Sequence, residues 1–147
     1  MQIRYLKSFD VGAVTQHKLW YLPVHQSWLS CGKDLVLNRF SFDRKGLQII
    51  NSMKVHNDEI TDIVEIEHPT KCIVTCSLDK KIHMYSLLRC EMIRTFPQHN
   101  KTSVKQLCYF EEYGRYLLSA GSEQDIYVWA VDNIVDDPLY GRLGGHK

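Results

Sequence analysis

Cysteines have the widest chemical range of the side chains in this sequence, and five are present: Cys31, Cys72, Cys76, Cys90 and Cys108. A structural zinc site needs paired thiolates, usually supplied by two Cys-x-x-Cys units. Cys72 and Cys76 stand four positions apart and have no matching second pair, so their spacing favours free thiols over a metal site. We therefore expect no metal or other cofactor. A cysteine nucleophile would need a nearby histidine as its base, and Cys108 is the candidate for such an irregular site.

Motifs of the common enzyme classes are missing from the sequence. It contains no Gly-x-Ser-x-Gly elbow, no phosphate-binding glycine loop and no His-Glu-x-x-His pair. Gly12 and Gly114 stand alone and are typical of turns. We therefore expect a protein that is not an enzyme.

A hydroxyl, an acid and an aromatic residue recur at fixed offsets in three windows, 30–41, 75–86 and 119–130. Each window opens on a hydroxyl, carries the acid at its fifth position and the aromatic residue at its eleventh. The triplets are Ser30, Asp34 and Phe40; Thr75, Asp79 and Tyr85; and Ser119, Glu123 and Trp129. The windows start 45 and 44 residues apart. Self-similarity at such a period indicates a repeat architecture.

Short strands must position these residues. Runs such as KCIVTCSL and DIYVWAV are rich in β-branched and aromatic residues and are bounded by turn formers, and no window keeps a helical apolar spacing. Each period holds about four strands. In the middle period we predict strands over 60–66, 72–76, 81–87 and 91–96. Four antiparallel strands in about 40–45 residues are typical of a β-propeller blade.

The chain resembles the WD-repeat family of β-propellers over nearly its whole length. That family places a Gly-His before the first strand, a Ser or Thr on the second, an Asp in the next turn and a Trp on the third. The resemblance assigns these places to His56, Thr75, Asp79 and Tyr85 in the middle period, and to His99, Ser119, Glu123 and Trp129 in the last. It implies a polar network that locks each blade. In that network the acid accepts from one imidazole nitrogen and the hydroxyl bridges the other toward the aromatic ring.

His56 and Asp79 could instead form a catalytic dyad. The same constellation recurs in the next period, whereas a single active site would not repeat, so we favour the structural interpretation.

The repeats depart from the family pattern at several positions. A true Gly-His occurs only at Gly145 and His146, and no Trp-Asp pair is present. The first period has Asp10 and Val11 where a histidine is expected, so its network is in doubt.

The repeats divide the chain into an outer strand of a preceding blade at 1–10, blades at 11–55, 56–98 and 99–144, and the start of a following blade at 145–147. The expected fold is all-β: a partial β-propeller of about three four-stranded blades that does not close by itself. Propellers typically use about 4 to 8 blades, which protects their sheet edges. We therefore expect a piece of a larger propeller whose remaining blades lie on the same or another chain.

Charge and hydropathy exclude two classes of partner. Eighteen Lys and Arg against seventeen Asp and Glu leave a formal charge of +1, so no nucleic acid is expected. The longest stretch without these four residues, 19–32, is too short to span a membrane. The start of the sequence lacks the apolar core of a signal peptide, which favours a cytoplasmic location.

Loops that lead into the first strand of a blade are the best candidates for binding other proteins. They contain Asn57, Asp58, Glu59, Asn100, Lys101 and Thr102. The segments HNDEITDIVEI and FPQHNKTSVKQLCYFEEYG also look like parts of long WD-repeat proteins of cilia and flagella. This narrower resemblance implies a non-catalytic scaffold that docks axonemal or microtubule-associated proteins. The alternative is a soluble WD-repeat adaptor that recruits partners in ubiquitylation or trafficking complexes.

Overall fold

The computed structural model describes residues 2, 4, 8, 14–67, 71–96, 102–112, 114–132 and 139–144. Every regular element in these ranges is a β-strand. The predicted outer strand at 1–10 lies almost wholly outside them. Also outside the described ranges are Asp10, Val11, His99, Asn100, Lys101, Gly145 and His146.

The strands of the described residues form three antiparallel sheets of four, each in chain order. Sheet 1 contains β1 (Gln16–Leu22), β2 (Ser27–Gly32), β3 (Val36–Asp43) and β4 (Gly46–Lys54). Sheet 2 contains β5 (Ile60–Glu67), β6 (Lys71–Ser77), β7 (Ile82–Ser86) and β8 (Glu91–Thr95). Sheet 3 contains β9 (Val104–Phe110), β10 (Tyr116–Gly121), β11 (Ile126–Ala130) and β12 (Leu139–Leu143).

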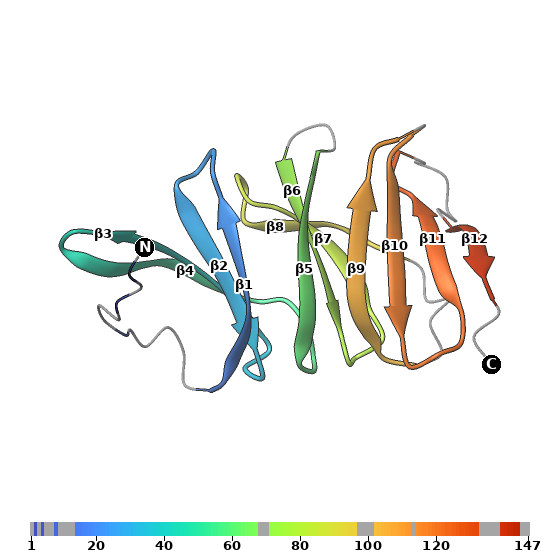
Figure 1. Ribbon diagram of the computed structural model, residues 1–147, viewed down its shortest axis with the longest axis horizontal. Coiled ribbons are helices and arrows are strands. Elements are labelled where there is room, and N and C mark those ends of the chain that lie inside the picture. The colour runs from blue at the N-terminus through green and yellow to red at the C-terminus, as the bar shows by residue number, and fades with distance from the viewer. Residues whose placement is uncertain are drawn as a thin grey trace.

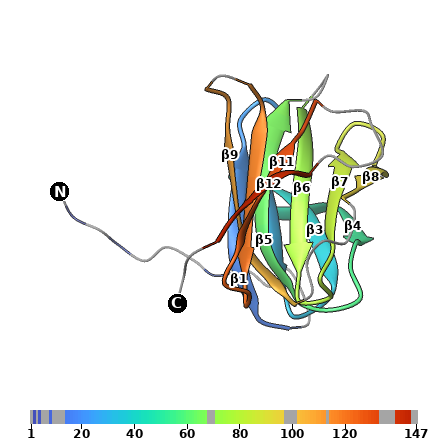
Figure 2. The same ribbon diagram turned by 90° about the vertical axis from the view of Figure 1, so that its right-hand side faces the viewer.

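The sheets stand in a row with their first strands on one side, as Figure 1 shows for β1, β5 and β9. Figure 2 looks along the row, and in this view the three sheets overlap one another, as successive blades of a propeller do. The row does not close into a ring within the described residues. The predicted all-β fold, a partial propeller of four-stranded blades, is therefore confirmed.

Local chemistry explains the tight connections. In the turn between β3 and β4, the Asp43 carboxylate accepts hydrogen bonds from the backbone N–H groups of Lys45 and Gly46, at 2.8 and 3.2 Å. Gly46 has a φ of 129°, which a residue with a Cβ rarely adopts. An aspartate followed three residues later by glycine thus fixes this hairpin.

Alternation along the strands gives each sheet two faces, and the facing sides of neighbouring sheets form the core. Ten buried residues pack between sheets 1 and 2: Leu22, Leu29, Cys31, Leu37, Val55, Ile60, Ile63, Ile73, Tyr85 and Leu87. A second cluster lies between sheets 2 and 3 and includes Val74, Met84, Phe96 and Trp129. The core is therefore a pair of inter-sheet layers, with sheet 2 buried on both faces.

Asp62 joins all three sheets at their first strands. Its Oδ1 is 2.7 Å from Lys18 Nζ on β1, and its Oδ2 accepts from the Leu107 N–H on β9 at 2.8 Å. Its side chain is 9% exposed, and a carboxylate removed from water to this degree requires such partners. Nearby, Thr61 Oγ1 donates to the Val104 carbonyl at 2.7 Å. These contacts hold the first strands β1, β5 and β9 together. They do not join the last strands of the sheets.

Candidate functional site

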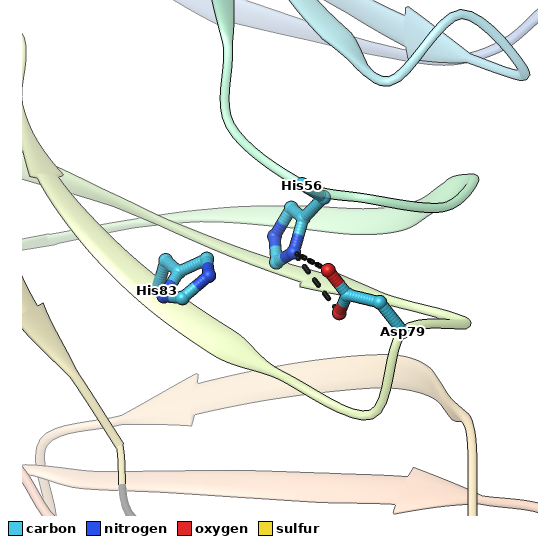
Figure 3. Close-up of side chains that lie close together, drawn as sticks. All are labelled: His56, Asp79 and His83. Carbon is cyan, nitrogen blue, oxygen red and sulfur yellow. Dashed lines mark hydrogen bonds and ion pairs between the residues drawn. The ribbon is translucent and has the colours of Figure 1, made fainter.

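His56 lies in the connection between β4 and β5, where the chain passes from sheet 1 to sheet 2. Asp79 lies in the turn between β6 and β7, which the Ser77 hydroxyl shapes by accepting from the Asp79 N–H at 3.0 Å. Lys80 in the same turn has a φ of 71°. Figure 3 shows the Asp79 carboxylate facing the imidazole of His56.

His56 has a partner on each ring nitrogen. Nδ1 lies 3.0 and 3.2 Å from the two carboxylate oxygens of Asp79, and Nε2 lies 2.8 Å from Thr75 Oγ1. Asp79 also accepts from the N–H groups of Asn57 and Lys81, at 3.0 and 2.9 Å. The structure thus brings three of the four predicted residues of the middle period, His56, Thr75 and Asp79, into one hydrogen-bonded network.

Burial and hydrogen bonds set the charges of this network. Burial lowers the pKa of His56, although the adjacent Asp79 carboxylate opposes the shift. Burial would raise the pKa of Asp79, but the Asn57 N–H and His56 outweigh it and hold that pKa below its usual range. At neutral pH a carboxylate therefore faces a neutral imidazole. Nδ1–H donates to Asp79, and Nε2 accepts the proton of the Thr75 hydroxyl.

Tyr85, the fourth predicted member, makes a different contact from the expected one. Its hydroxyl donates to the Val55 carbonyl at 2.9 Å, and no bond between Tyr85 and Thr75 is found. In sheet 3, by contrast, Trp129 Nε1 donates to Ser119 Oγ at 2.9 Å, as a bridge to the ring requires. A phenol carries its polar atom at the far end of the ring, so Tyr85 reaches past the hydroxyl to the backbone.

In sheet 3 the acid is also tied down. Glu123 accepts from the Thr102 N–H at 2.9 Å and from the Tyr127 hydroxyl at 2.5 Å. The predicted histidine of this blade, His99, lies outside the described residues. Ser119, Glu123 and Trp129 therefore lie at equivalent positions in sheet 3. A hydrogen bond from this group to His99 stays a prediction.

Sheet 1 differs from sheets 2 and 3 at its repeat hydroxyl. The Ser30 hydroxyl, buried on β2, has no hydrogen-bond partner in the described part of the chain. The acid of this blade binds amides instead, since Asp34 Oδ2 accepts from Gln16 Nε2 at 2.9 Å and from Asn38 Nδ2 at 3.4 Å. Within the described residues, sheet 1 thus lacks the hydroxyl bond that sheets 2 and 3 make.

His83 was not singled out from the sequence. It lies on β7 opposite Thr75, stacks on His56 with ring centroids 4.6 Å apart, and its Nδ1 is 2.9 Å from Thr95 Oγ1. Burial lowers its pKa to about 4. A polar residue paired with the repeat hydroxyl was the available signal, because Asn38 and Tyr127 occupy the equivalent places.

The three groups His56, Asp79 and His83 also satisfy the composition of a metal site. Their ligand atoms lie within 4.8 Å of one another. Imidazole lone pairs lie in the ring plane, however, and two rings stacked at 29° direct them past each other rather than toward one ion. Both nitrogens of His56 are already bonded. The geometry therefore favours a structural network over a metal centre.

The structure gives little support to a reactive cysteine. Burial raises the pKa of Cys31 and of Cys76 to about 12, so neither is a thiolate at neutral pH. Cys108 is exposed and lines a hollow of ≈ 400 Å³ with Lys18, Asp62 and Leu118, but no histidine is among the described residues of that hollow. Among the described residues that line this hollow, none is a histidine base for Cys108.

The candidate partner-binding loops are partly visible. Asn57 and Asp58 are exposed, whereas Glu59 is half-buried and lies 3.4 Å from His17 Nδ1. Thr102 is half-buried as well, and its hydroxyl has no hydrogen-bond partner among the described residues. Asn100 and Lys101 lie outside those residues. No helix in the described residues is long and apolar enough to cross a membrane.

Comparison with known proteins identifies the family to which these repeats belong. No curated protein matches the chain. The family described as "WD domain, G-beta repeat" matches residues 47–86 and 90–130, which is more than half of the sequence. Each match begins in or beside the last strand of one sheet, β4 or β8, and ends with the third strand of the next. The repeat unit thus includes the connection that carries the histidine, and the chain belongs to the WD-repeat family.

Proposed function

We propose that this chain is a non-catalytic protein-interaction scaffold that docks other proteins in a ciliary or axonemal assembly. The observation that supports this proposal most strongly is that the His56–Asp79 pair is enclosed in the blade: both nitrogens of His56 and the carboxylate of Asp79 are hydrogen-bonded there. Because His56 and Thr75 are both buried, a substrate in solution does not reach this pair. WD-repeat proteins are generally scaffolds, which supports the same conclusion.

The partner surface that we propose is formed by the loops entering sheets 2 and 3. Asn57 and Asp58 project from the loop whose backbone Asp79 fixes, so exposed polar groups stand on a rigid base. Asn100, Lys101 and Thr102 would extend this surface over the next blade, with Glu59 at its margin. Their mixed charges suit a polar protein surface rather than a nucleic acid.

Further blades, on the same or another chain, are proposed to cover the two open faces of the row. Lys18 points toward sheet 2, so Leu19, the next residue on β1, points away from it and is 56% exposed. Its equivalent in sheet 2, Ile63, is fully buried against sheet 1. At the other end, Phe110 is 38% exposed, whereas Ile66, its equivalent one repeat earlier, is 1% exposed. Each open face thus repeats a pattern that is buried inside the row.

The ciliary context rests on the sequence resemblance and needs a cellular test. A tagged copy of the chain would be expressed in ciliated cells, which are then extracted with detergent and separated into axonemal and soluble fractions. We expect the tag in the axonemal fraction, and we expect the double variant Asn57→Ala/Asp58→Lys to shift it to the soluble fraction.

Lys33→Ala, in an exposed turn of sheet 1, is the matched control and should leave the distribution unchanged. A tag that is soluble in every variant would contradict the axonemal role and would favour an adaptor of ubiquitylation or trafficking complexes instead.

A further inference from the structure

A second candidate binding site lies at the rim of the row, between the outer strands of sheets 1 and 2. It is a groove of ≈ 500 Å³, here named the rim groove, walled by Met53 and Lys54 of β4 on one side and by His83, Tyr85 and Met92 of sheet 2 on the other. It is distinct from the loops around Asn57. A volume of this size is typical of sites that hold a small ligand or part of a peptide.

Blade geometry explains why the groove exists. Sheets 1 and 2 are tied together at their first strands, where His17 Nε2 lies 2.8 Å from the Ile60 carbonyl and Lys18 pairs with Asp62. Figure 2 shows β4 and β8 on the side of the molecule opposite β1 and β9. Sheets that are joined at one edge and splay toward the other leave a wedge, which side chains from both walls only partly fill.

The rim groove has both polar and apolar walls, and two of its apolar side chains are methionines. Val55 and Tyr85 are buried at its base, while Met53 is half-buried and Met92 is 54% exposed. Methionine side chains are flexible and polarisable, and proteins use them on surfaces that accept varied apolar partners. One side of the groove is bridged, because Asn51 Nδ2 on sheet 1 lies 3.0 Å from Cys90 Sγ on sheet 2. A ligand there would be short.

Two ammonium groups at the rim groove have no carboxylate partner among the described residues. Lys54 and Lys81 line the groove from opposite walls, and neither forms an ion pair in the described part of the chain. No aspartate or glutamate is among the residues that line it. The surface therefore combines apolar side chains with two ammonium groups that make no ion pair among the described residues, and the complementary ligand is partly apolar and anionic.

We propose that the rim groove binds a short acidic peptide segment that inserts an apolar side chain between Met53 and Met92 and pairs its carboxylates with Lys54 and Lys81. This inference deepens the proposed scaffold role, and rests on it in taking the ligand to be a protein segment. Asn57 and Asp58 of the proposed loop surface do not line the rim groove.

Methionine methyl NMR tests the proposal directly. The chain would be labelled at its methionine methyl groups and titrated with the nine-residue peptide GDELDLEDG. We expect the signals of Met53 and Met92 to shift together. The signal of Met84, which is fully buried toward sheet 3, should stay in place and serves as an internal control.

Two control peptides separate the two halves of the recognition. GNQLNLQNG keeps the leucines but removes the charge, and GDESDSEDG keeps the charge but removes the apolar anchor. Each should bind at least about tenfold more weakly, a loss of about 1.4 kcal/mol.

Matched lysine variants locate the charge. Lys54→Gln/Lys81→Gln should weaken binding of GDELDLEDG by about tenfold or more, whereas Lys105→Gln, an exposed lysine on β9, should leave it unchanged. The proposal is overturned if Met53 and Met92 do not shift at about 1 mM peptide, a concentration that detects binding as weak as about 4 kcal/mol. Equal weakening by Lys105→Gln would overturn it too. Such a failure would leave the axonemal fractionation result, which depends on Asn57 and Asp58, untouched.

Discussion

At the scale of single residues, the three blades keep the positions of the hydroxyl and the aromatic residue but not the hydrogen bonds that these residues make. The Ser119 hydroxyl accepts a hydrogen bond from Trp129. The equivalent hydroxyl of Thr75 instead donates to His56, and Tyr85 donates to the Val55 carbonyl. In sheet 1, where the sequence has no histidine at the expected place, the Ser30 hydroxyl has no hydrogen-bond partner among the described residues.

Asp79 is the residue on which the middle network depends most. Asp79→Ala removes the partner of His56 Nδ1 and the acceptor of two backbone N–H groups. Hydrogen bonds to a charged group contribute about 1.5–3 kcal/mol each, so we expect the free energy of unfolding to fall by about 3 kcal/mol or more. Urea denaturation followed by tryptophan fluorescence measures the change. Asp58→Ala, at an exposed neighbour, should cost under about 0.5 kcal/mol, and equal losses would show that the network contributes little.

The stacked imidazoles make stability depend on pH. In the unfolded chain His83 has its ordinary pKa of 6.5, and in the folded chain burial lowers this pKa to about 4. Between these values the unfolded chain binds the proton more readily. Stability therefore declines as the pH falls from about 6.5 to about 4, by up to about 3 kcal/mol, and this contribution is fully present above pH 6.5.

Urea midpoints measured in half-unit steps from pH 7.5 to 4.5 would show this decline. His83→Gln should flatten the curve. A wild-type curve already flat over this interval would contradict the prediction.

At the scale of strands and sheets, the sequence predicts what is local. The windows at 75–86 and 119–130 place the hydroxyl and aromatic residues on the second and third strands, and the structure has β6 and β7, then β10 and β11, in those stretches. Contacts between sheets were not predictable. Asp62 looks like an ordinary polar residue of an alternating strand, and only the approach of β1 and β9 makes it a junction. The His83 stack was missed for the same reason, because two positions 27 residues apart meet only after the blade folds.

Repeat equivalence also misleads at the third position of each window. Ser77 stands there in sheet 2, and Gly121 in sheet 3. A Cβ on Gly121 would lie 2.0 Å from the Ser103 carbonyl oxygen, so Gly121→Ser is expected to destabilise the fold by about 1 to 3 kcal/mol although the neighbouring repeat has serine. Thermal unfolding checks this. Gly141→Ala, where no atom lies within 4 Å of the added Cβ, is the matched control, and a similar effect of both changes would refute the steric argument.

At the scale of the molecule, each internal interface joins the same two kinds of face. The face of sheet 2 that bears Tyr85 packs on sheet 1, and the face of sheet 3 that bears Trp129 packs on sheet 2. The corresponding face of sheet 1 carries Leu19 and meets no sheet in the described residues. At the other end, sheet 3 presents Phe110. The two ends are therefore complementary in kind, and apolar surface of this sort drives association when it is left uncovered.

For the chain alone in solution, we expect concentration-dependent self-association through these two faces. Leu19→Ser/Phe110→Ser should make it monomeric in sedimentation velocity without lowering its unfolding midpoint, because both side chains are already exposed. Leu88→Ser, at an 81% exposed position in the turn before β8, removes similar apolar area from the rim and should leave association unchanged. Ile63→Ser marks the opposite extreme, since burying a hydroxyl in place of a fully buried isoleucine should cost about 3 kcal/mol or more. If the wild-type chain stays monomeric at every concentration, the open faces do not attract each other, and only blades of different composition would cover them.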